Sequence, residues 1–247
     1  MTPEALFDRD ASWYDAAHDS HSVDGHALRA RLETVIRRVG SGPGDLLDAG
    51  MGPGRLLERL ASRDWTVSGV DLSERMIEHA RRRLPQHANR LFQAPVEALP
   101  FADSTFDIVV ATGVLEYVSD PTLAVGELVR VLRPAGRLIA SLPNRRSIHV
   151  LSKRAYYPLV RAAKRALATE RPAPPRQNGL TPDALERLLR HNGLDAIAFE
   201  RTSFAIVPTP LDLIASRTAA RAADALERGH RFGRLLATQL VVEARRR

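Results

Sequence analysis

The chain has 247 residues, of which 44% are hydrophobic and 26% are charged, a composition typical of a globular protein large enough for one α/β domain with a sizeable core. It contains no cysteine, which excludes disulfides, thiolate metal sites and a cysteine nucleophile. The net charge of +7 is local, because residues 145–176 hold nine Lys and Arg side chains and one acidic residue.

Residues 1–43 precede the first predicted strand and are expected to form an N-terminal helical cap. Apolar residues recur on one face over about 24–39, which predicts a helix there. Tyr14 lies ahead of this helix, next to His18 and His21. The two histidines have a spacing found in metal sites, but the acidic residues beside them suit a solvent-exposed face equally well. We therefore expect no metal.

The segment LLDAGMGPGRLL at 46–57 predicts a buried strand, a glycine turn and a helix. Gly50, Gly52 and Gly54 allow positive φ angles and let a ligand approach the main chain closely. The helix N-terminus that follows offers unpaired N–H groups to an anionic group. This combination at the edge of a sheet predicts a nucleotide-type site.

The glycine spacing alone leaves two cofactor classes open. Asp71, at the end of the second predicted strand, can accept both hydroxyls of a ribose, and the same chemistry serves NAD. The dinucleotide pattern G-x-G-x-x-G, however, requires a glycine where this chain has Arg55.

Strands and helices alternate along the chain, which predicts a parallel sheet with right-handed crossovers. The predicted strands are 45–49, 65–70, 90–94, 106–111, 136–142, 195–203 and 235–244. The predicted helices after the cap are 55–63, 73–83, 121–132, 181–191 and 208–228, with Ser73 and Thr181 as N-caps. The final ARRR is expected to be frayed.

Three further segments carry a family resemblance: EALPFADSTFD at 97–107, VLEYVSD at 114–120 and GELVRVLRPAGRLIASLPN at 126–144. Together with the glycine turn, they resemble consecutive motifs of class I S-adenosylmethionine-dependent methyltransferases of the ubiquinone/menaquinone type. The resemblance covers about 100 residues, 45–144. It implies a Rossmann-like seven-stranded, mostly parallel sheet of order 3-2-1-4-5-7-6 with helices on both faces and an antiparallel last strand.

The resemblance implies that the cofactor is S-adenosylmethionine. The residues implied to bind it are Tyr14, Asp48, Ala49, Gly50, Gly52, Gly54, Asp71, Leu72, Met76, Pro95, Val96, Thr112 and Leu115. Met76 suits the core as well as an adenine face. Pro95 departs from the family, which commonly has an acidic residue two positions before Glu97 to bind the adenine amino group. The backbone N–H of Val96, assisted by Gln93, is the expected replacement.

The resemblance also divides the single domain into the cap (1–43), a cofactor-binding core (44–144), a basic lid insertion (145–180) and the end of the sheet (181–247). Pro158 predicts two short helices in the insertion rather than one. The basic segment 145–176 suits a solvent-exposed lid face, an anionic or lipid-linked acceptor, or peripheral contact with an anionic membrane. No signal peptide or transmembrane helix is expected, so we predict a cytoplasmic location.

We therefore predict methyl transfer to a small-molecule or lipid-linked acceptor, at oxygen or else carbon. Glu116, Tyr117, His149 and His18 are candidate proton acceptors, but no motif selects among them. Nucleic acid is not an expected partner, since aromatic residues are 5% of the chain. Two alternatives stay open: a cofactor-binding module without catalysis, suggested by Pro95, and a nicotinamide-dependent oxidoreductase.

Overall fold

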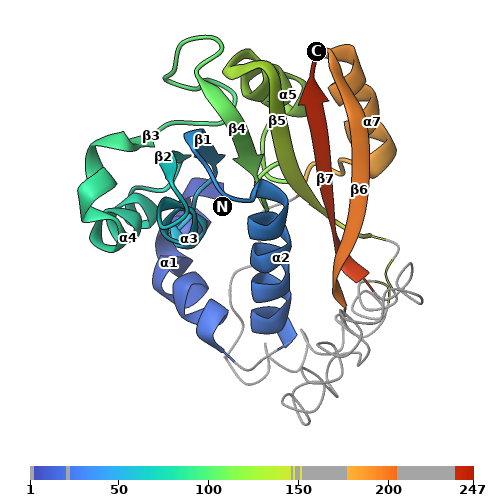
Figure 1. Cartoon of the computed structure of the whole chain (residues 1–247). Helices are drawn as coiled ribbons and strands as arrows, with labels where there is room; N and C mark the ends of the chain where they lie inside the picture. Colours follow the sequence, from blue (N-terminus) through green and yellow to red (C-terminus); the bar gives the residue numbers. More distant parts are fainter. Residues whose placement is uncertain (1–2, 21–22, 146, 148–150, 152–176, 205–236) are drawn as a thin grey trace.

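A seven-stranded sheet forms the centre of the computed structural model, which describes residues 3–20, 23–145, 147, 151, 177–204 and 237–247 (Figure 1). The strands are β1 (Gly44–Ala49), β2 (Trp65–Asp71), β3 (Leu91–Gln93), β4 (Phe106–Ala111), β5 (Leu132–Pro143), β6 (Leu194–Phe204) and β7 (Ala237–Arg246). Their order is β3-β2-β1-β4-β5-β7-β6. The first five strands are parallel, and β7 pairs antiparallel with both β5 and β6. The predicted fold class, strand order and antiparallel last strand are confirmed.

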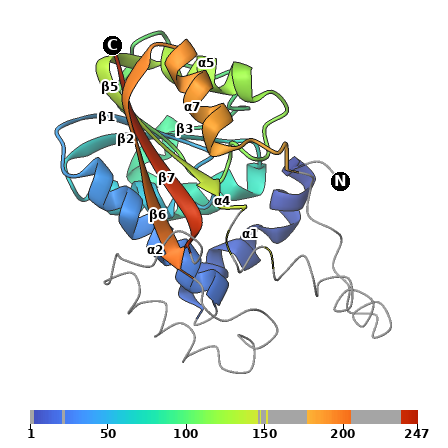
Figure 2. The ribbon, with the colours of Figure 1, turned by 90° about the vertical axis from the view of Figure 1, so that its right-hand side faces the viewer.

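Helices cover both faces of this sheet. They are α1 (Pro3–Asp19), α2 (Val23–Val39), α3 (Arg55–Ala61), α4 (Glu74–Arg83), α5 (Pro121–Arg130) and α7 (Pro182–His191), with a 3-10 turn η1 (Pro85–Arg90). One core contains side chains of α2, α3 and α4, and the other contains those of α5 and α7. Figure 2 shows α2 and the α5–α7 pair on opposite sides of the sheet. Leu46 faces the first core and Leu47 the second, as the two-residue period of a strand requires.

Side-chain caps determine where several helices begin. Ser73 Oγ accepts a hydrogen bond from the N–H of Met76 at 3.1 Å, and Thr181 Oγ1 accepts from Ala184 N at 3.2 Å. Pro182 follows at the first helical position, where its missing N–H costs nothing. Both caps were predicted, because the residue types and their positions ahead of an apolar periodicity are visible in the sequence.

The fifth strand begins earlier than predicted. Leu132 already pairs with Phe106, and the register then shifts before Arg137 pairs with Ile108. This bulge accommodates Pro134 and the positive φ of 62° at Ala135. The predicted helix over 121–132 correspondingly ends at Arg130.

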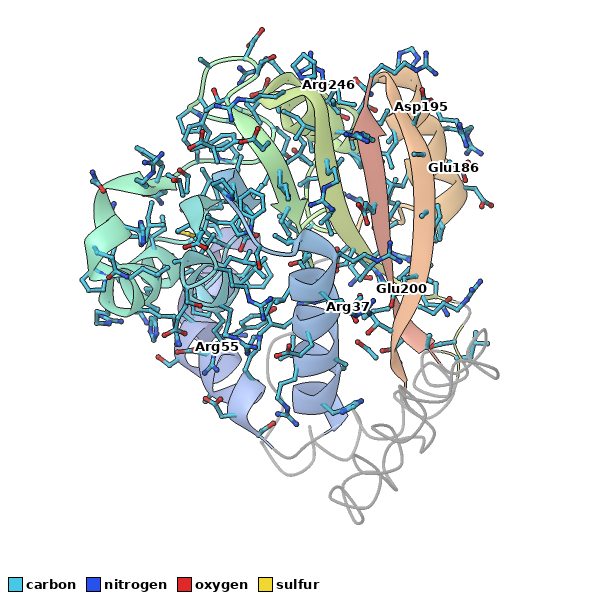
Figure 3. All side chains as sticks on the ribbon, viewed as in Figure 1. Arg37, Arg55, Glu186, Asp195, Glu200 and Arg246 are labelled. Carbon is cyan, nitrogen blue, oxygen red and sulfur yellow. The ribbon has the colours of Figure 1, made fainter. Side chains whose placement is uncertain are left out.

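The prediction that the C-terminal ARRR is frayed is wrong. Strand β7 continues to Arg246, whose Nη1 donates to the carbonyl of Val129 at 2.9 Å and so satisfies the end of α5. Arg247 Nη2 donates to Asp195 Oδ1 at 2.8 Å. Figure 3 shows Arg246 and Asp195 at the same end of the sheet. Composition suggested disorder, but backbone pairing and guanidinium contacts order this end.

The cap has more structure than predicted. The expected helix over 24–39 is α2, but α1 was not identified as a helix. The predicted insertion helices and the predicted helix 208–228 lie outside the described residues, apart from isolated positions at their edges. Within the described part of the chain, no helix has the length and apolar character needed to cross a membrane.

Candidate cofactor and acceptor site

The glycine turn after β1 approaches its neighbours closely on one side and is open on the other. Gly50, Gly52 and Gly54 have φ angles of 79°, 53° and 78°. A Cβ on Gly50 would lie 2.7 Å from the Cβ of Val114, so only glycine fits there. At Gly52 the nearest atom would be Tyr14 Cε1 at 3.9 Å, which leaves room beside the main chain. The turn therefore presents an open backbone face at Gly52.

Asp71, the last residue of β2, holds this turn in place. Its Oδ2 accepts from Gly52 N at 2.8 Å and its Oδ1 accepts from Ser73 N at 2.9 Å. Burial raises the pKa of Asp71, and these backbone donors partly oppose that effect. Each carboxylate oxygen keeps a second lone pair, so the side chain can still accept hydroxyl donors.

A cavity of about 420 Å³ opens at the carboxyl ends of β1, β2 and β4. Nine predicted cofactor residues line it: Tyr14, Gly50, Gly52, Asp71, Leu72, Met76, Pro95, Val96 and Thr112. Phe7 and Glu97 also contribute to its wall. This is the switch point at which the strand order reverses, where open α/β sheets bind ligands.

The remaining predicted cofactor residues lie elsewhere. Ala49 and Leu115 are fully buried in the core, and a Cβ on Gly54 would meet Ala80 of α4 at 3.0 Å. The absence of a side chain at Gly54 therefore lets the start of α3 pack closely against α4. Gln93, expected to help bind adenine, donates through Nε2 to the carbonyl of Leu72 at 3.1 Å. Asp48 lines a second, smaller cavity.

This small cavity, of about 60 Å³, contains groups of opposite charge. Asp48 is 2% exposed, and its Oδ1 has no hydrogen-bond partner among the described residues. Burial, and next the nearby charge of Asp71, raise the pKa of Asp48 to about 7, while Arg31 opposes them. Arg31 reaches the same cavity from α2, and its Nη2 donates to the Tyr14 hydroxyl at 3.2 Å.

Sequence reasoning missed Arg31. It lies three residues after Leu28 and four before Val35, on the helix face that otherwise carries apolar side chains. An arginine on a buried helix face is the signal that identifies it, because a charged side chain is buried only when it has a partner or a function.

Ionic contacts hold α1 over both cavities. Asp15 accepts from Arg55 Nε at 2.6 Å and from Arg83 Nη2 at 2.8 Å. Arg55 Nη2 also donates to Asp19 Oδ2 at 2.6 Å, and Figure 3 shows Arg55 beside α1. Arg55, the residue that interrupts the dinucleotide glycine pattern, therefore docks the helix that carries Tyr14.

The candidate proton acceptors occupy different places. His18 lines the small cavity, and burial lowers its pKa to about 4, which leaves the ring neutral. Tyr117 lines the large cavity, where its ring meets that of Phe7 edge to face at 5.4 Å between centroids. Glu116 is buried next to it, and His149 lies outside the described residues. No group of three or more metal-ligating side chains occurs within the described residues, which do not include His21.

Comparison with known proteins agrees with this geometry. A family model described as a methyltransferase domain matches residues 47–140. Over 138 residues the chain is 35% identical to the demethylmenaquinone methyltransferase of Renibacterium salmoninarum, covering 56% of each protein. It is 36% identical over 134 residues to the malonyl-(acyl-carrier protein) O-methyltransferase of Enterobacter lignolyticus, covering 54% of this chain and 50% of that one. The chain thus spans about half the length of these curated relatives.

Among solved structures, the chain resembles a Thermotoga maritima protein described as a SAM-dependent methyltransferase and possible histamine N-methyltransferase. The TM-score is 0.67 at 19% identity, with 98% of this chain and 99% of that chain covered, which shows a shared fold. The sequence motifs, the match of residues 47–140 to a methyltransferase-domain model and the shared fold all indicate similarity to class I S-adenosylmethionine-dependent methyltransferases.

Proposed function

We propose that this protein transfers a methyl group from S-adenosylmethionine to an oxygen atom of a small-molecule or lipid-linked acceptor. The observation that carries the proposal is the pairing of a large, mostly apolar cavity with a small cavity of opposite charges beneath the glycine turn. S-adenosylmethionine has the same two parts, because it joins a nucleoside to an amino acid that carries an ammonium and a carboxylate group.

The residues present suit the cofactor at both ends. Asp48, whose Oδ1 has no hydrogen-bond partner in the part of the chain that the structure describes, would hold the ammonium group, and Arg31 would hold the carboxylate. Asp71 would accept the ribose hydroxyls. Met76 and the backbone of Val96 would contact the adenine, with Pro95 beside them in place of the acid common in the family.

When bound, the cofactor supplies an electrophilic methyl group on a sulfonium. The protein's own contribution is to orient the acceptor and to exclude water, and α1 with Phe7 and Tyr14 covers the site for this purpose.

Two considerations favour oxygen as the accepting atom. Tyr117, a titratable residue after β4, lines the large cavity, and a proton acceptor is useful only when the methyl acceptor loses a proton. One relative at 36% identity is named an O-methyltransferase. The name of the Renibacterium relative suggests a second class of acceptor, a quinone.

Calorimetric titration with S-adenosylmethionine, S-adenosylhomocysteine and NAD tests the proposal. We expect micromolar binding of both sulfur compounds, no binding of NAD, and at least tenfold weaker binding by Asp71→Asn. Asp195→Asn, the same change at the start of β6 and outside both cavities, should bind as the wild type does. Binding of NAD alone would establish the oxidoreductase alternative, and binding without turnover on any acceptor would establish an inactive module.

A further inference from the structure

The residues that the two cavities share give the large cavity a direction. Tyr14, Gly50, Gly52 and Thr112 line both of them. The proposed function assigns the amino-acid end of the cofactor to the small cavity, so the nucleoside enters the large cavity at these shared residues. Asp71, whose carboxylate accepts from Gly52 N at 2.8 Å, then meets the ribose. The base of the nucleoside therefore lies beyond Asp71.

The part of the wall beyond Asp71 is the turn that follows β3. Ala94 N donates to the carbonyl of Asp71 at 3.1 Å, which keeps this turn next to the end of β2. Residues 94–97 all line the large cavity, and of these four only Glu97 has a polar side chain. A base bound in this part of the cavity therefore lies beside a carboxylate.

The two oxygens of the Glu97 carboxylate have different surroundings. Oε1 accepts from Ser119 N at 2.8 Å and from Ser119 Oγ at 2.9 Å, which joins the turn after β3 to the loop after β4. Oε2 accepts no hydrogen bond in the part of the chain that the structure describes. Glu97 is only partly buried, so a ligand in the cavity can reach it. The contacts at Oε1 thus hold Oε2 in place as an open acceptor.

A hydrogen-bond donor lies one residue before this acceptor. None of the described residues accepts from the backbone N–H of Val96, which also lines the cavity. A carboxylate oxygen and a backbone N–H together offer one acceptor and one donor. Adenine presents the complementary pair on its Watson–Crick edge, an exocyclic amino group that donates and a ring nitrogen, N1, that accepts. Hypoxanthine reverses both groups, because its O6 accepts and its N1–H donates.

We propose that Glu97 Oε2 accepts a hydrogen bond from the amino group of the cofactor's adenine while Val96 N donates to N1, so that Glu97 selects adenine over hypoxanthine. This inference rests on the proposed methyltransferase function. Among the described residues that line the large cavity, Asp71 is the only other carboxylate. Its hydrogen bonds to Gly52 N and Ser73 N keep it at the ribose.

The substitution Glu97→Gln separates this selection from a purely structural role. The carbonyl oxygen of the glutamine amide can still accept from Ser119, which preserves the connection between the two loops. The amide NH2 group then replaces Oε2, so that an acceptor becomes a donor. A donor at this place no longer matches the adenine amino group, but it matches O6 of hypoxanthine. A structural role alone would not change the preference between the two bases.

The experiment measures Kd by calorimetry for S-adenosylhomocysteine and for S-inosylhomocysteine, in which an oxygen replaces the exocyclic amino group. The proteins are the wild type, Glu97→Gln, Ser119→Ala and Glu186→Gln. Ser119→Ala removes one hydrogen bond to Oε1 and leaves Oε2 unchanged. Glu186→Gln is the matched control, because Glu186 lies on α7 outside both cavities and pairs with Arg190 at 2.9 Å (Figure 3). Thermal unfolding shows whether each variant is folded.

We expect the wild type to bind S-adenosylhomocysteine at least about 100-fold more tightly than S-inosylhomocysteine, because hypoxanthine places an acceptor against Oε2 and a donor against Val96 N. Glu97→Gln should bind S-adenosylhomocysteine roughly tenfold more weakly and S-inosylhomocysteine more tightly than the wild type does. Ser119→Ala should weaken both ligands by the same small factor, so their ratio stays that of the wild type. Glu186→Gln should change neither Kd.

Three results would overturn the inference. The first is equal binding of the two ligands by the wild type, a test that needs no variant to fold. The second is a wild-type ratio of affinities in Glu97→Gln. The third is a ratio that falls as far in Ser119→Ala as in Glu97→Gln, because selection would then depend on the connection between the loops. Failure of the wild type to bind either ligand would instead refute the proposed function itself.

Discussion

At the scale of single residues, Asp48 has opposite effects on stability and binding. Its pKa is about 7 in the folded chain against an ordinary 3.8, so the folded state holds a proton that the unfolded state releases. The free energy of unfolding therefore falls as pH rises from about 4 through 7. A bound ammonium group favours the ionised carboxylate of Asp48, so ligand binding should strengthen as the pH rises through the same range.

The first prediction concerns Asp48→Asn. We expect the free protein to gain stability at pH 8, by up to about 4 kcal/mol, because no buried carboxylate has to ionise. The same variant should bind S-adenosylhomocysteine at least tenfold more weakly, and the increase of wild-type affinity between pH 5.5 and 7.5 should disappear. Thermal unfolding and calorimetry measure the two effects. A variant that is both less stable and unchanged in affinity would contradict this role for Asp48.

The two glycines of the turn provide a second prediction. Gly50→Ala places a Cβ 2.7 Å from Val114 at a positive φ, so we expect a loss of about 3 kcal/mol in stability. Gly52→Ala meets open space and should cost about 1 kcal/mol, but it fills the side of the turn that faces the cavity. Denaturant unfolding should thus be affected mainly in the first variant and cofactor affinity mainly in the second. Equal effects of both on stability would argue against an open face at Gly52.

At the scale of elements, the sequence predicts those that carry a local pattern of residues, but not those that depend on ionic contacts between distant residues. Strand β4 was predicted with its observed bounds, since an uninterrupted apolar run signals a buried parallel strand. Helix α1 was missed because its docking depends on Asp15 meeting Arg55 and Arg83, which are 40 and 68 residues away. No periodicity within α1 reveals these partners. Arg31 escaped notice for a related reason, since its partner Tyr14 belongs to another helix.

The third prediction concerns this ionic contact. The hydrogen bond from Arg55 and the charge of Arg83 hold the pKa of Asp15 below its usual value, although burial alone would raise it. This contribution to stability is present above about pH 4 and is lost as the pH falls further. Asp15→Asn should weaken α1 docking by about 1 kcal/mol and speed release of S-adenosylhomocysteine several-fold.

Hydrogen exchange in α1 and stopped-flow release measure these effects. Asp103→Asn, which alters an exposed pair with Arg130, is the matched control. Unchanged exchange in α1 and unchanged release in Asp15→Asn would show that α1 is held by other contacts.

At the scale of the whole molecule, the alternation of strands and helices predicted a parallel sheet, and the glycine turn predicted the edge at which its site lies. The strand order and the antiparallel last strand were implied by the family resemblance. The end of the chain was not predictable in this way. Arg246 is ordered by carbonyls at the end of α5, more than 100 residues away, so a tail that looks disordered in isolation completes the last strand. The site likewise combines α1, α2 and the strand ends, and only the strand ends carry motifs.

A fourth prediction follows from the site joining these elements. A ligand that binds only the folded state at 100 times its Kd adds about 2.7 kcal/mol to stability. For a chain of this size, we expect S-adenosylhomocysteine to raise Tm by roughly 5–10 °C. The shift should be much smaller in Asp71→Asn and unchanged in Asp195→Asn. An equal shift in all three proteins would show that the ligand binds elsewhere.

The most direct test of the central claim compares S-adenosylhomocysteine with 5′-methylthioadenosine, which lacks the amino-acid portion. Calorimetry on wild type, Asp48→Asn and Arg31→Gln separates the two cavities. We predict that each substitution weakens S-adenosylhomocysteine at least tenfold and leaves 5′-methylthioadenosine within about twofold of its wild-type affinity. Equal weakening of both ligands, or no weakening of either, would contradict the assignment of the small cavity to the amino-acid end of the cofactor.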